Sequence, residues 1–274
     1  MGRILLDGVG IDALSLAAAA DEVVRRAARG AGGLVVTPNA DILLRVRRDP
    51  TLRALLDDAE LVVADGVPLL WAARLAGEPL PGRVNGTDLL VAVAERCGRA
   101  GLGLFLLGGT PATPSGGTPA TPSGGTPAAT PAARAADRLA QICPGLALPG
   151  WYSPPFGFEN DPEEIDRIEA ALAAARPTVC AVGLGFPKQE RLAAALRQRF
   201  PAVVFCCLGS AIGLVGGEQA RAPRWAQRAG LEWLFRLAQE PRRLARRYLR
   251  DDLPFVIGLF LRSRRRGPTS RAPG

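Results

Sequence analysis

Short apolar runs alternate along the chain with longer segments in which apolar residues recur at helical spacing. The runs that predict strands are Arg3–Leu6, Gly33–Thr37, Leu61–Ala64, Leu102–Leu107, Thr178–Val182 and Val203–Leu208. The segments that predict helices include Leu14–Arg29, the segment that follows Pro38–Asp41 (PNAD) and ends at Arg48, Val67–Ala73, Ala132–Ile142 and Gln189–Phe200. Continuous apolar runs that are each followed by a helix are typical of strands buried on both faces of a parallel sheet. The pattern therefore predicts an α/β fold with a doubly wound, mostly parallel sheet.

One segment interrupts this order. The unit G-T-P-A-T-P-S-G occurs twice between Gly109 and Gly124, and a third, imperfect copy begins at Gly125. A tract so rich in Pro, Gly, Thr and Ser cannot bury enough apolar surface to order itself. We therefore predict a low-complexity repeat loop at 109–131 within an α/β core at 1–217.

Positive charge gathers at the C-terminal end of the chain. The net charge is +8, and residues 218–274 hold fourteen arginines and five acidic residues, whereas residues 1–217 are nearly balanced. Apolar residues in this end recur at helical spacing among the arginines, which predicts a basic amphipathic appendage at 218–266 and a disordered tail at 267–274. A neutral core with a cationic appendage favours a polyanionic partner: an anionic membrane surface, a pyrophosphate or nucleic acid. The alternative is a helical hairpin that packs on the core.

The amino-acid composition limits which side chains could catalyse a reaction or bind a metal. The chain contains no histidine, which excludes Ser–His triads, histidine metal sites and imidazole acid–base catalysis. Proton transfer then falls to a carboxylate, a tyrosine, a cysteine or Lys188, the only lysine. The five cysteines form no metal-ligand spacing, and their odd number favours a reducing compartment. The apolar stretch Leu253–Leu261 is about half as long as a membrane span, so we expect a cytoplasmic protein, soluble or peripheral.

Polar or glycine-rich residues follow four of the predicted strands, where ligands bind in open α/β sheets. These segments are Thr37–Asp41 (TPNAD), Asp65–Gly66, Gly108–Gly109 and Gly183–Glu190 (GLGFPKQE). In the last of them, Lys188, Gln189 and the amides that open the next helix are suited to meet an anion. Asp65 directly follows an apolar strand, so partial burial would raise its pKa towards that of a useful base. Alternatively, Asp65 caps the helix that follows it.

Taken together, these motifs resemble the WecG/TagA/CpsF family of bacterial glycosyltransferases (glycosyltransferase family 26). The matching segments are Thr37–Asp41, Ala64–Gly66, Arg83–Leu89, Phe105–Gly109, Gly183–Glu190, Arg221–Trp225 and Gly230–Leu249. The resemblance covers nearly the whole chain outside the repeat loop and the last few residues, and implies a Rossmann-like fold of the GT-E type. It also implies transfer of an N-acetylmannosamine-type sugar from a UDP donor to a polyprenyl-diphosphate-linked amino sugar, with inversion and without a metal. This reaction takes place at the cytoplasmic membrane face, in the synthesis of cell-surface polysaccharide or teichoic acid.

The resemblance further implies roles for single residues. Asp65 matches the proposed base and Thr37 and Asn39 match residues beside it, so these three are the candidate catalytic residues. The candidate substrate-binding residues are Arg83, Gly108, Gly109, Gly183, Gly185, Lys188, Gln189, Arg236, Arg243 and Arg246. The last three belong to the appendage, which closes over the site and supplies arginines for the diphosphate. No cofactor, metal ligand or nucleic-acid partner is expected, and assembly into a homo-oligomer is left open.

Three departures from the family pattern concern the substrate site. Gly213 stands where the family tends to have an acidic residue after the Cys206–Ser210 strand. The repeat tract enlarges the loop after Gly108-Gly109, and an unusual SPPFGF sequence follows Trp151-Tyr152.

Other readings stay open beside this one. A nicotinamide-dependent oxidoreductase would need the fingerprint G-x-G-x-x-G, but Lys188 occupies the place of its third glycine. A nucleic-acid-binding module could use the arginine clusters together with Trp225, Trp233 and Tyr248, but no reading motif accompanies them. Within the family, transfer of N-acetylmannosaminuronic acid or another hexose is the alternative, because a difference of one hydroxyl group depends on a few pocket contacts.

Overall fold

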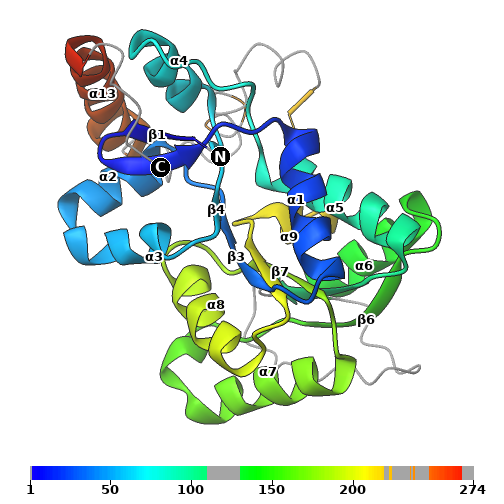
Figure 1. Cartoon of the computed structure of the whole chain (residues 1–274). Coiled ribbons are helices and arrows are strands. Elements are labelled where there is room, and N and C mark those ends of the chain that lie inside the picture. The colour runs from blue at the N-terminus through cyan, green and yellow to red at the C-terminus, as the bar shows by residue number, and fades with distance from the viewer. Residues whose placement is uncertain are drawn as a thin grey trace.

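The structure is a computed structural model that describes residues 2–109, 130–218, 222–223, 235, 237 and 247–266. Its central sheet has six parallel strands in the order β4-β3-β8-β7-β5-β6 (Figure 1). The strands are β3 (Gly33–Val36), β4 (Leu61–Val62), β5 (Gly103–Gly108), β6 (Ala147–Tyr152), β7 (Val179–Gly183) and β8 (Val204–Cys207). Their order and direction confirm the predicted doubly wound α/β fold.

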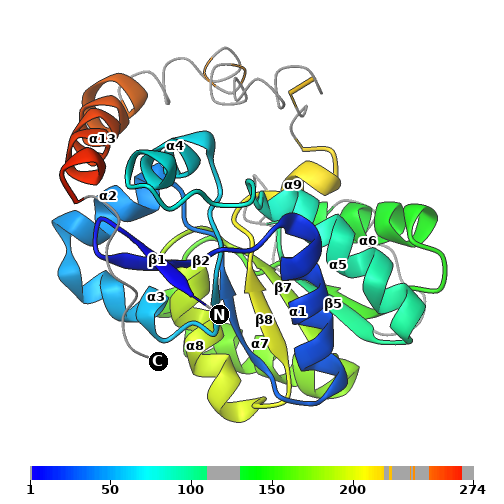
Figure 2. The ribbon, with the colours of Figure 1, turned by 45° about the horizontal axis from the view of Figure 1, so that its top comes forward.

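Helices cover both faces of this sheet (Figures 1 and 2). On one face lie α1 (Leu16–Ala28), α5 (Gly86–Ala100), α6 (Pro131–Ile142) and α9 (Ala211–Val215), and on the other α2 (Ala40–Arg48), η1 (Pro50–Arg53), α3 (Ala54–Asp57), η2 (Phe158–Asn160), α7 (Pro162–Ala175) and α8 (Lys188–Arg199). Each face has its own buried apolar cluster. Strand β8 contributes Val204 and Cys206 to one cluster and Phe205 and Cys207 to the other, because successive side chains of a strand point to opposite faces. This double burial explains the continuous apolar run in the sequence.

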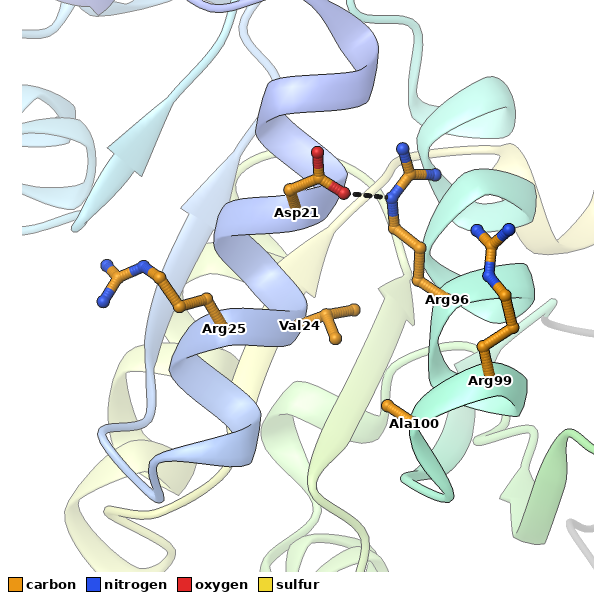
Figure 3. Close-up of a pocket in the computed structure, with 6 residues that line it drawn as sticks. All are labelled: Asp21, Val24, Arg25, Arg96, Arg99 and Ala100. Carbon is orange, nitrogen blue, oxygen red and sulfur yellow. Dashed lines mark hydrogen bonds and ion pairs between the residues drawn. The ribbon is translucent and has the colours of Figure 1, made fainter.

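Helices α1 and α5 lie side by side on their face of the sheet (Figure 3). Arg96 of α5 donates a hydrogen bond from Nε to Asp21 Oδ1 of α1 at 2.5 Å. An open hollow of about 480 Å³ lies between the helices, lined by Asp21, Val24, Arg25, Arg96, Arg99 and Ala100. The hollow lies towards the C-terminal ends of both helices. Helix α1 is followed by β3, and helix α5 is followed by β5. The hollow is therefore at the amino edge of the sheet, away from the predicted site residues.

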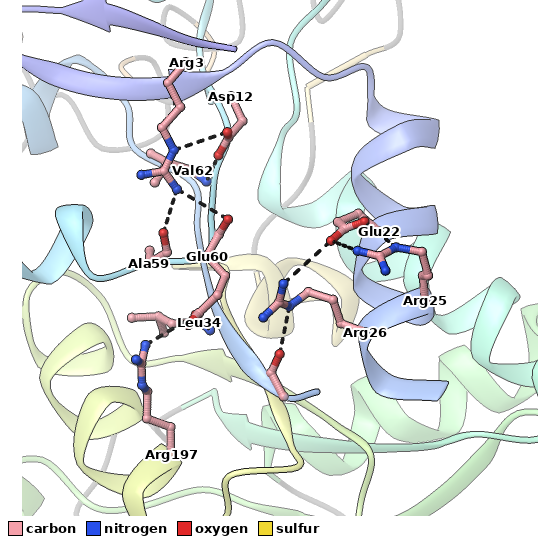
Figure 4. Close-up of polar contacts among 11 residues, drawn as sticks. Arg3, Asp12, Glu22, Arg25, Arg26, Leu34, Ala59, Glu60, Val62 and Arg197 are labelled. Atoms are coloured by element: carbon pink, nitrogen blue, oxygen red, sulfur yellow. Dashed lines mark hydrogen bonds and ion pairs between the residues drawn. The ribbon is translucent and has the colours of Figure 1, made fainter. Parts of the chain in front are cut away.

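Strands β1 (Arg3–Leu6) and β2 (Val9–Asp12) form an antiparallel hairpin outside the central sheet. The sequence predicted the first strand but neither the second strand nor their pairing. Asp12 connects the hairpin to the edge strand β4 (Figure 4). Its Oδ2 accepts a hydrogen bond from the Val62 amide at 2.8 Å, and its Oδ1 accepts one from Arg3 Nε at 3.2 Å. An outward-facing amide of the edge strand is thereby satisfied.

The last described helix packs on the core. Helix α13 (Leu253–Arg266) follows a π-helical segment, η3 (Arg247–Asp252), and lies beside α4 (Val67–Leu75) (Figure 2). The rings of Trp71 and Phe260 are 6.1 Å apart between centroids, and Arg262 forms an ion pair with Asp7 of the hairpin at 2.8 Å. Helix α13 therefore packs on the core, whereas most of the residues that would complete a helical hairpin lie outside the described part of the chain. Among the described residues, no helix is long and apolar enough to cross a membrane.

Several sequence predictions lie wholly or partly outside the described residues. They are most of the repeat loop (110–129), most of the segment at 219–246, and the tail at 267–274. The division into a core, an appendage and a tail therefore stays a prediction. The five cysteines are all described, and each is a buried free thiol, as expected for small apolar side chains.

Candidate active site

Polar and glycine residues from several strands meet at the carboxyl edge of the sheet. Thr37 directly follows β3, Asp65 follows β4, and Gly108 and Gly183 end β5 and β7. Because all six strands are parallel, these ends share one edge. The structure therefore brings the predicted strand-end residues to the same side of the molecule.

Asp65 lies at the end of the edge strand with its side chain partly exposed. Its backbone amide donates to the Pro38 carbonyl at 2.9 Å, and its Oδ1 accepts a hydrogen bond from Asn85 Nδ2 at 3.1 Å. Helix α4 begins at Val67 and its N-cap is Gly66, which has a φ of 123°. The alternative prediction that Asp65 caps this helix is therefore wrong. Its carboxylate faces Asn85 instead.

Asn85 is a site residue that the sequence prediction did not include. It is buried at the N-cap of α5, where its Oδ1 accepts a hydrogen bond from the Thr87 amide at 2.9 Å. One end of the side-chain amide thus caps the helix while the other end donates to Asp65. A Cβ on Gly86 would lie 2.7 Å from the Leu208 carbonyl oxygen, so the helix begins directly against the end of β8. An Asn before an amphipathic segment is a recognised helix-start signal, which could have located this cap.

Thr37 and Asn39 lie on the loop that contacts Asp65 through Pro38. Thr37 is buried, and its Oγ1 donates to the Cys207 carbonyl of β8 at 3.1 Å. Asn39 is the N-cap of α2, and its Oδ1 accepts a hydrogen bond from the Ile42 amide at 3.0 Å. Both side chains hold the loop against neighbouring elements. The candidate catalytic residues Thr37, Asn39 and Asp65 therefore lie close together in space.

Three of the predicted glycines lie in close packing contacts that leave little room for a side chain. A Cβ on Gly108 would lie 2.7 Å from the Gly183 carbonyl carbon, and one on Gly183 would lie 3.0 Å from the Gly209 carbonyl oxygen. A Cβ on Gly109 would lie 2.7 Å from the Pro131 side chain. Gly185 differs, because its φ is 80° and no atom lies within 4 Å of its Cβ position. This glycine borders open space at the carboxyl edge.

Gln189 is buried and joins two loops. Its Oε1 accepts hydrogen bonds from the amides of Leu184 at 3.3 Å and Gly185 at 3.2 Å, and from the amide of Gly209 at 3.1 Å. Its Nε2 donates to Glu190 Oε1 at 2.8 Å. The sequence predicted that Lys188, Gln189 and the amides that open α8 meet an anion, and this stays a prediction. The loop amides of Leu184 and Gly185, which precede this helix, donate to the buried Gln189 oxygen.

The predicted cationic residues occupy different surroundings. Lys188 is exposed at the start of α8 and forms an ion pair with Glu159 of η2, which lowers the pKa of that carboxyl group. Arg83 is partly buried in the segment before α5, where the next amide, of Val84, donates to the Ala64 carbonyl at 2.9 Å. Arg236, Arg243 and Arg246 lie outside the described residues.

Position 213 has a glycine, and the side chain of Glu218 fills the space beside it. A Cβ on Gly213 would overlap Oε2 of Glu218, so the Glu218 carboxylate occupies the place of a side chain at 213. Burial raises the pKa of Glu218, and the nearby charge of Arg134 opposes this effect. Arg134 also donates from Nε to the Gly216 carbonyl at 2.9 Å. The chain thus keeps a carboxylate beside α9 in spite of Gly213.

Comparison with known proteins places this chain in a family. A sequence model described as "Glycosyl transferase WecG/TagA/CpsF family" matches residues 4–269. A protein from Bacillus spizizenii, "N-acetylglucosaminyldiphosphoundecaprenol N-acetyl-beta-D-mannosaminyltransferase", is 28% identical over 216 residues, which are 78% of this chain and 74% of that protein. The resemblance stated from the sequence motifs is confirmed by a match over nearly the whole chain. The chain belongs to the WecG/TagA/CpsF family and is a glycosyltransferase.

Proposed function

We propose that this glycosyltransferase moves an N-acetylmannosamine-type sugar from a UDP donor to a polyprenyl-diphosphate-linked amino sugar, with inversion at the anomeric carbon. The observation that carries the proposal is the position of Asp65. Its carboxylate lies at the carboxyl edge of a parallel sheet, is partly exposed, and is oriented by the buried Asn85 amide at 3.1 Å. The name of the Bacillus spizizenii relative supports the choice of sugar and of acceptor.

In the proposed reaction, Asp65 acts as the general base. Its carboxylate accepts the proton of the acceptor hydroxyl as that oxygen attacks the anomeric carbon of the donor. The new C–O bond forms on the face opposite the diphosphate, the bond from the anomeric carbon to the diphosphate oxygen breaks, and UDP leaves with the electron pair. Asn85 keeps the carboxylate directed because its own amide is fixed by capping α5.

The leaving diphosphate needs positive charge as the bond breaks. We assign this role to Arg83 and to the appendage residues Arg236, Arg243 and Arg246, and we propose that transfer needs no metal. The arginine guanidinium group suits this task because it makes paired hydrogen bonds to phosphate oxygens. The sequence contains no D-x-D segment of the kind that holds Mg²⁺ in many nucleotide-sugar sites.

We also assign a donor contact to Glu218. Its carboxylate fills the space beside Gly213 of α9. A carboxylate there is suited to accept hydrogen bonds from the hydroxyl groups of the donor.

An apolar surface supports a peripheral membrane location. Leu253, Ile257 and Leu261 recur every four residues along α13 and are each at least half exposed. Trp71 and Leu75 of the adjoining α4 are also exposed. Arg250, Arg264 and Arg265 are exposed on η3 and α13. An apolar face with cationic residues beside it fits the cytoplasmic leaflet of an anionic membrane, where the lipid-linked acceptor would be.

A panel of UDP-sugars tests the proposed reaction. Each sugar is offered to the full-length protein with a synthetic short-chain lipid-diphosphate amino sugar, with and without a chelator, and the product's anomeric configuration is determined by NMR. We expect transfer from UDP-N-acetylmannosamine in preference to the uronic acid and other hexoses, inversion, and no effect of the chelator. Transfer from none of the donors would contradict the proposed function. Retention of configuration, or loss of activity with the chelator, would contradict the proposed mechanism.

A further inference from the structure

Glu190 is a buried carboxylic acid that forms no ion pair with any residue that the structure describes. Its exposed fraction is 2%, and Oε2 has no hydrogen-bond partner in the described part of the chain. Burial raises its pKa to about 7, and the effects that oppose this come from hydrogen bonds with Gln189 and with the backbone of Glu190 itself. A buried acid without a cation partner costs folding free energy. We therefore look for a role of Glu190 other than stabilisation of the fold.

This role lies in the contact with Gln189. A side-chain amide has an acceptor end and a donor end, and a half-turn exchanges them. With its oxygen towards the loops, Gln189 accepts hydrogen bonds from the amides of Leu184, Gly185 and Gly209. After a half-turn, the NH₂ group would face these three donors and every one of the hydrogen bonds would be lost. Glu190 Oε1 selects the first orientation, because at 2.8 Å it accepts a hydrogen bond from Nε2.

The two joined loops belong to different strand ends. Gly185 lies between β7 and α8, and Gly209 lies between β8 and α9. Both have positive φ values, 80° and 60°, and neither has an atom within 4 Å of its Cβ position, so both border open space. Ligands of open α/β sheets bind at this edge. The same end of β8 also accepts a hydrogen bond from Thr37 through the Cys207 carbonyl.

We propose that Glu190 is a positioning residue that orients the Gln189 amide and thereby holds the Gly185 and Gly209 loops in the geometry needed to bind the sugar-nucleotide donor. This inference rests on the proposed function for the identity of the donor. The hydrogen bonds that join Glu190, Gln189 and the two loops do not depend on that identity, because they are contacts within the chain.

Two variants of the full-length protein separate orientation from charge. Glu190→Gln keeps an oxygen that accepts from Gln189 Nε2, whereas Glu190→Met has a similar shape and no acceptor. Hydrogen exchange is measured at the amides of Gly185 and Gly209. The Leu208 amide, which donates to the Val182 carbonyl at 2.8 Å, serves as an internal control. The Michaelis constant for the UDP-sugar, kcat and the melting temperature at about pH 8 are measured on the same samples.

We expect Glu190→Met to exchange about tenfold faster at Gly185 and Gly209 but unchanged at Leu208. Its Michaelis constant for the donor should rise about tenfold, with a smaller change in kcat. Its melting temperature should stay within about 3 °C of the unmodified protein, because a costly buried acid has been removed. Glu190→Gln should match the unmodified protein in exchange and in donor affinity.

Three results would overturn the inference. The first is normal exchange and donor affinity in Glu190→Met. The second is a loss of both in Glu190→Gln, which would show that charge rather than orientation matters. The third is faster exchange at Leu208 together with a large fall in melting temperature, which would show a general structural role. Failure of the unmodified protein to transfer sugar would count against the proposed function alone. The exchange rates of the Gly185 and Gly209 amides report on the loop contacts and do not require catalysis.

Discussion

Glu190 should make the stability of the protein fall as the pH rises. In the unfolded chain this carboxyl group has an ordinary pKa of 4.5, and burial raises the pKa to about 7 in the folded protein. Between these values the folded state keeps a proton that the unfolded state has released. The free energy of unfolding therefore decreases with pH across this window and levels off above it. At roughly 1.4 kcal/mol per pH unit, the total loss is about 3 kcal/mol.

Replacing the acid with its amide isolates this effect. Glu190→Gln cannot ionise, so its free energy of unfolding should gain about 3 kcal/mol relative to the unmodified protein between pH 4.5 and about pH 8. Urea unfolding at the two pH values measures this difference, and all other titrating groups cancel because both proteins share them. Glu163→Gln is the matched control, because the Glu163 side chain is 82% exposed on α7. An equal difference between Glu190→Gln and the unmodified protein at both pH values would refute the reasoning.

Three further predictions follow from packing and exposure. Gly108→Ala should lower the free energy of unfolding by about 2–4 kcal/mol, because its φ is 139° and its Cβ would meet Gly183; Gly101→Ala, with a φ of 65° and no atom near, should cost about 1 kcal/mol by the same urea titration. Ile257→Glu should abolish cosedimentation with anionic liposomes, whereas Phe156→Glu, on an exposed loop after β6, should leave it intact; equal binding by both variants would exclude the α13 surface. Gly213→Asp should raise the Michaelis constant for the donor by displacing the Glu218 carboxylate, and adding Glu218→Ala should restore it, because the introduced carboxylate can then take the place that Glu218 leaves; no restoration would contradict a donor contact at this place.

Burial on both faces made most of the sheet predictable. The residues of β7 and β8 form continuous apolar runs because neighbouring side chains enter different apolar clusters. Strand β6 (Ala147–Tyr152) escaped prediction because it lies at the sheet edge, contains Pro149 and Gly150, and is only partly buried. Helix α5 was missed because the continuous apolar run near its start does not distinguish a buried helix from a strand.

The candidate site was predictable where its residues directly follow a strand. Asp65 and Thr37 could be located in this way, because the ends of parallel strands share one edge. The partner of Asp65 could not, because Asn85 is twenty residues away and reaches it through the cap of α5. The sequence also cannot reveal that Gln189 accepts from Gly209, since that contact depends on how two loops meet. Sequence spacing locates strand ends, but tertiary packing decides which side chains meet there.

Replacement of Asp65 by asparagine tests the central claim most directly. Asp65→Asn has the same shape and cannot accept a proton, while Asp57→Asn on α3 is the matched control because Asp57 is exposed. UDP binding is measured by calorimetry, and transfer is measured with the short-chain acceptor. The proposed base role predicts unchanged UDP affinity in both variants, and a loss of transfer of about 10²–10⁴-fold in Asp65→Asn alone. Transfer by Asp65→Asn at the rate of the unmodified protein would show that another group accepts the proton.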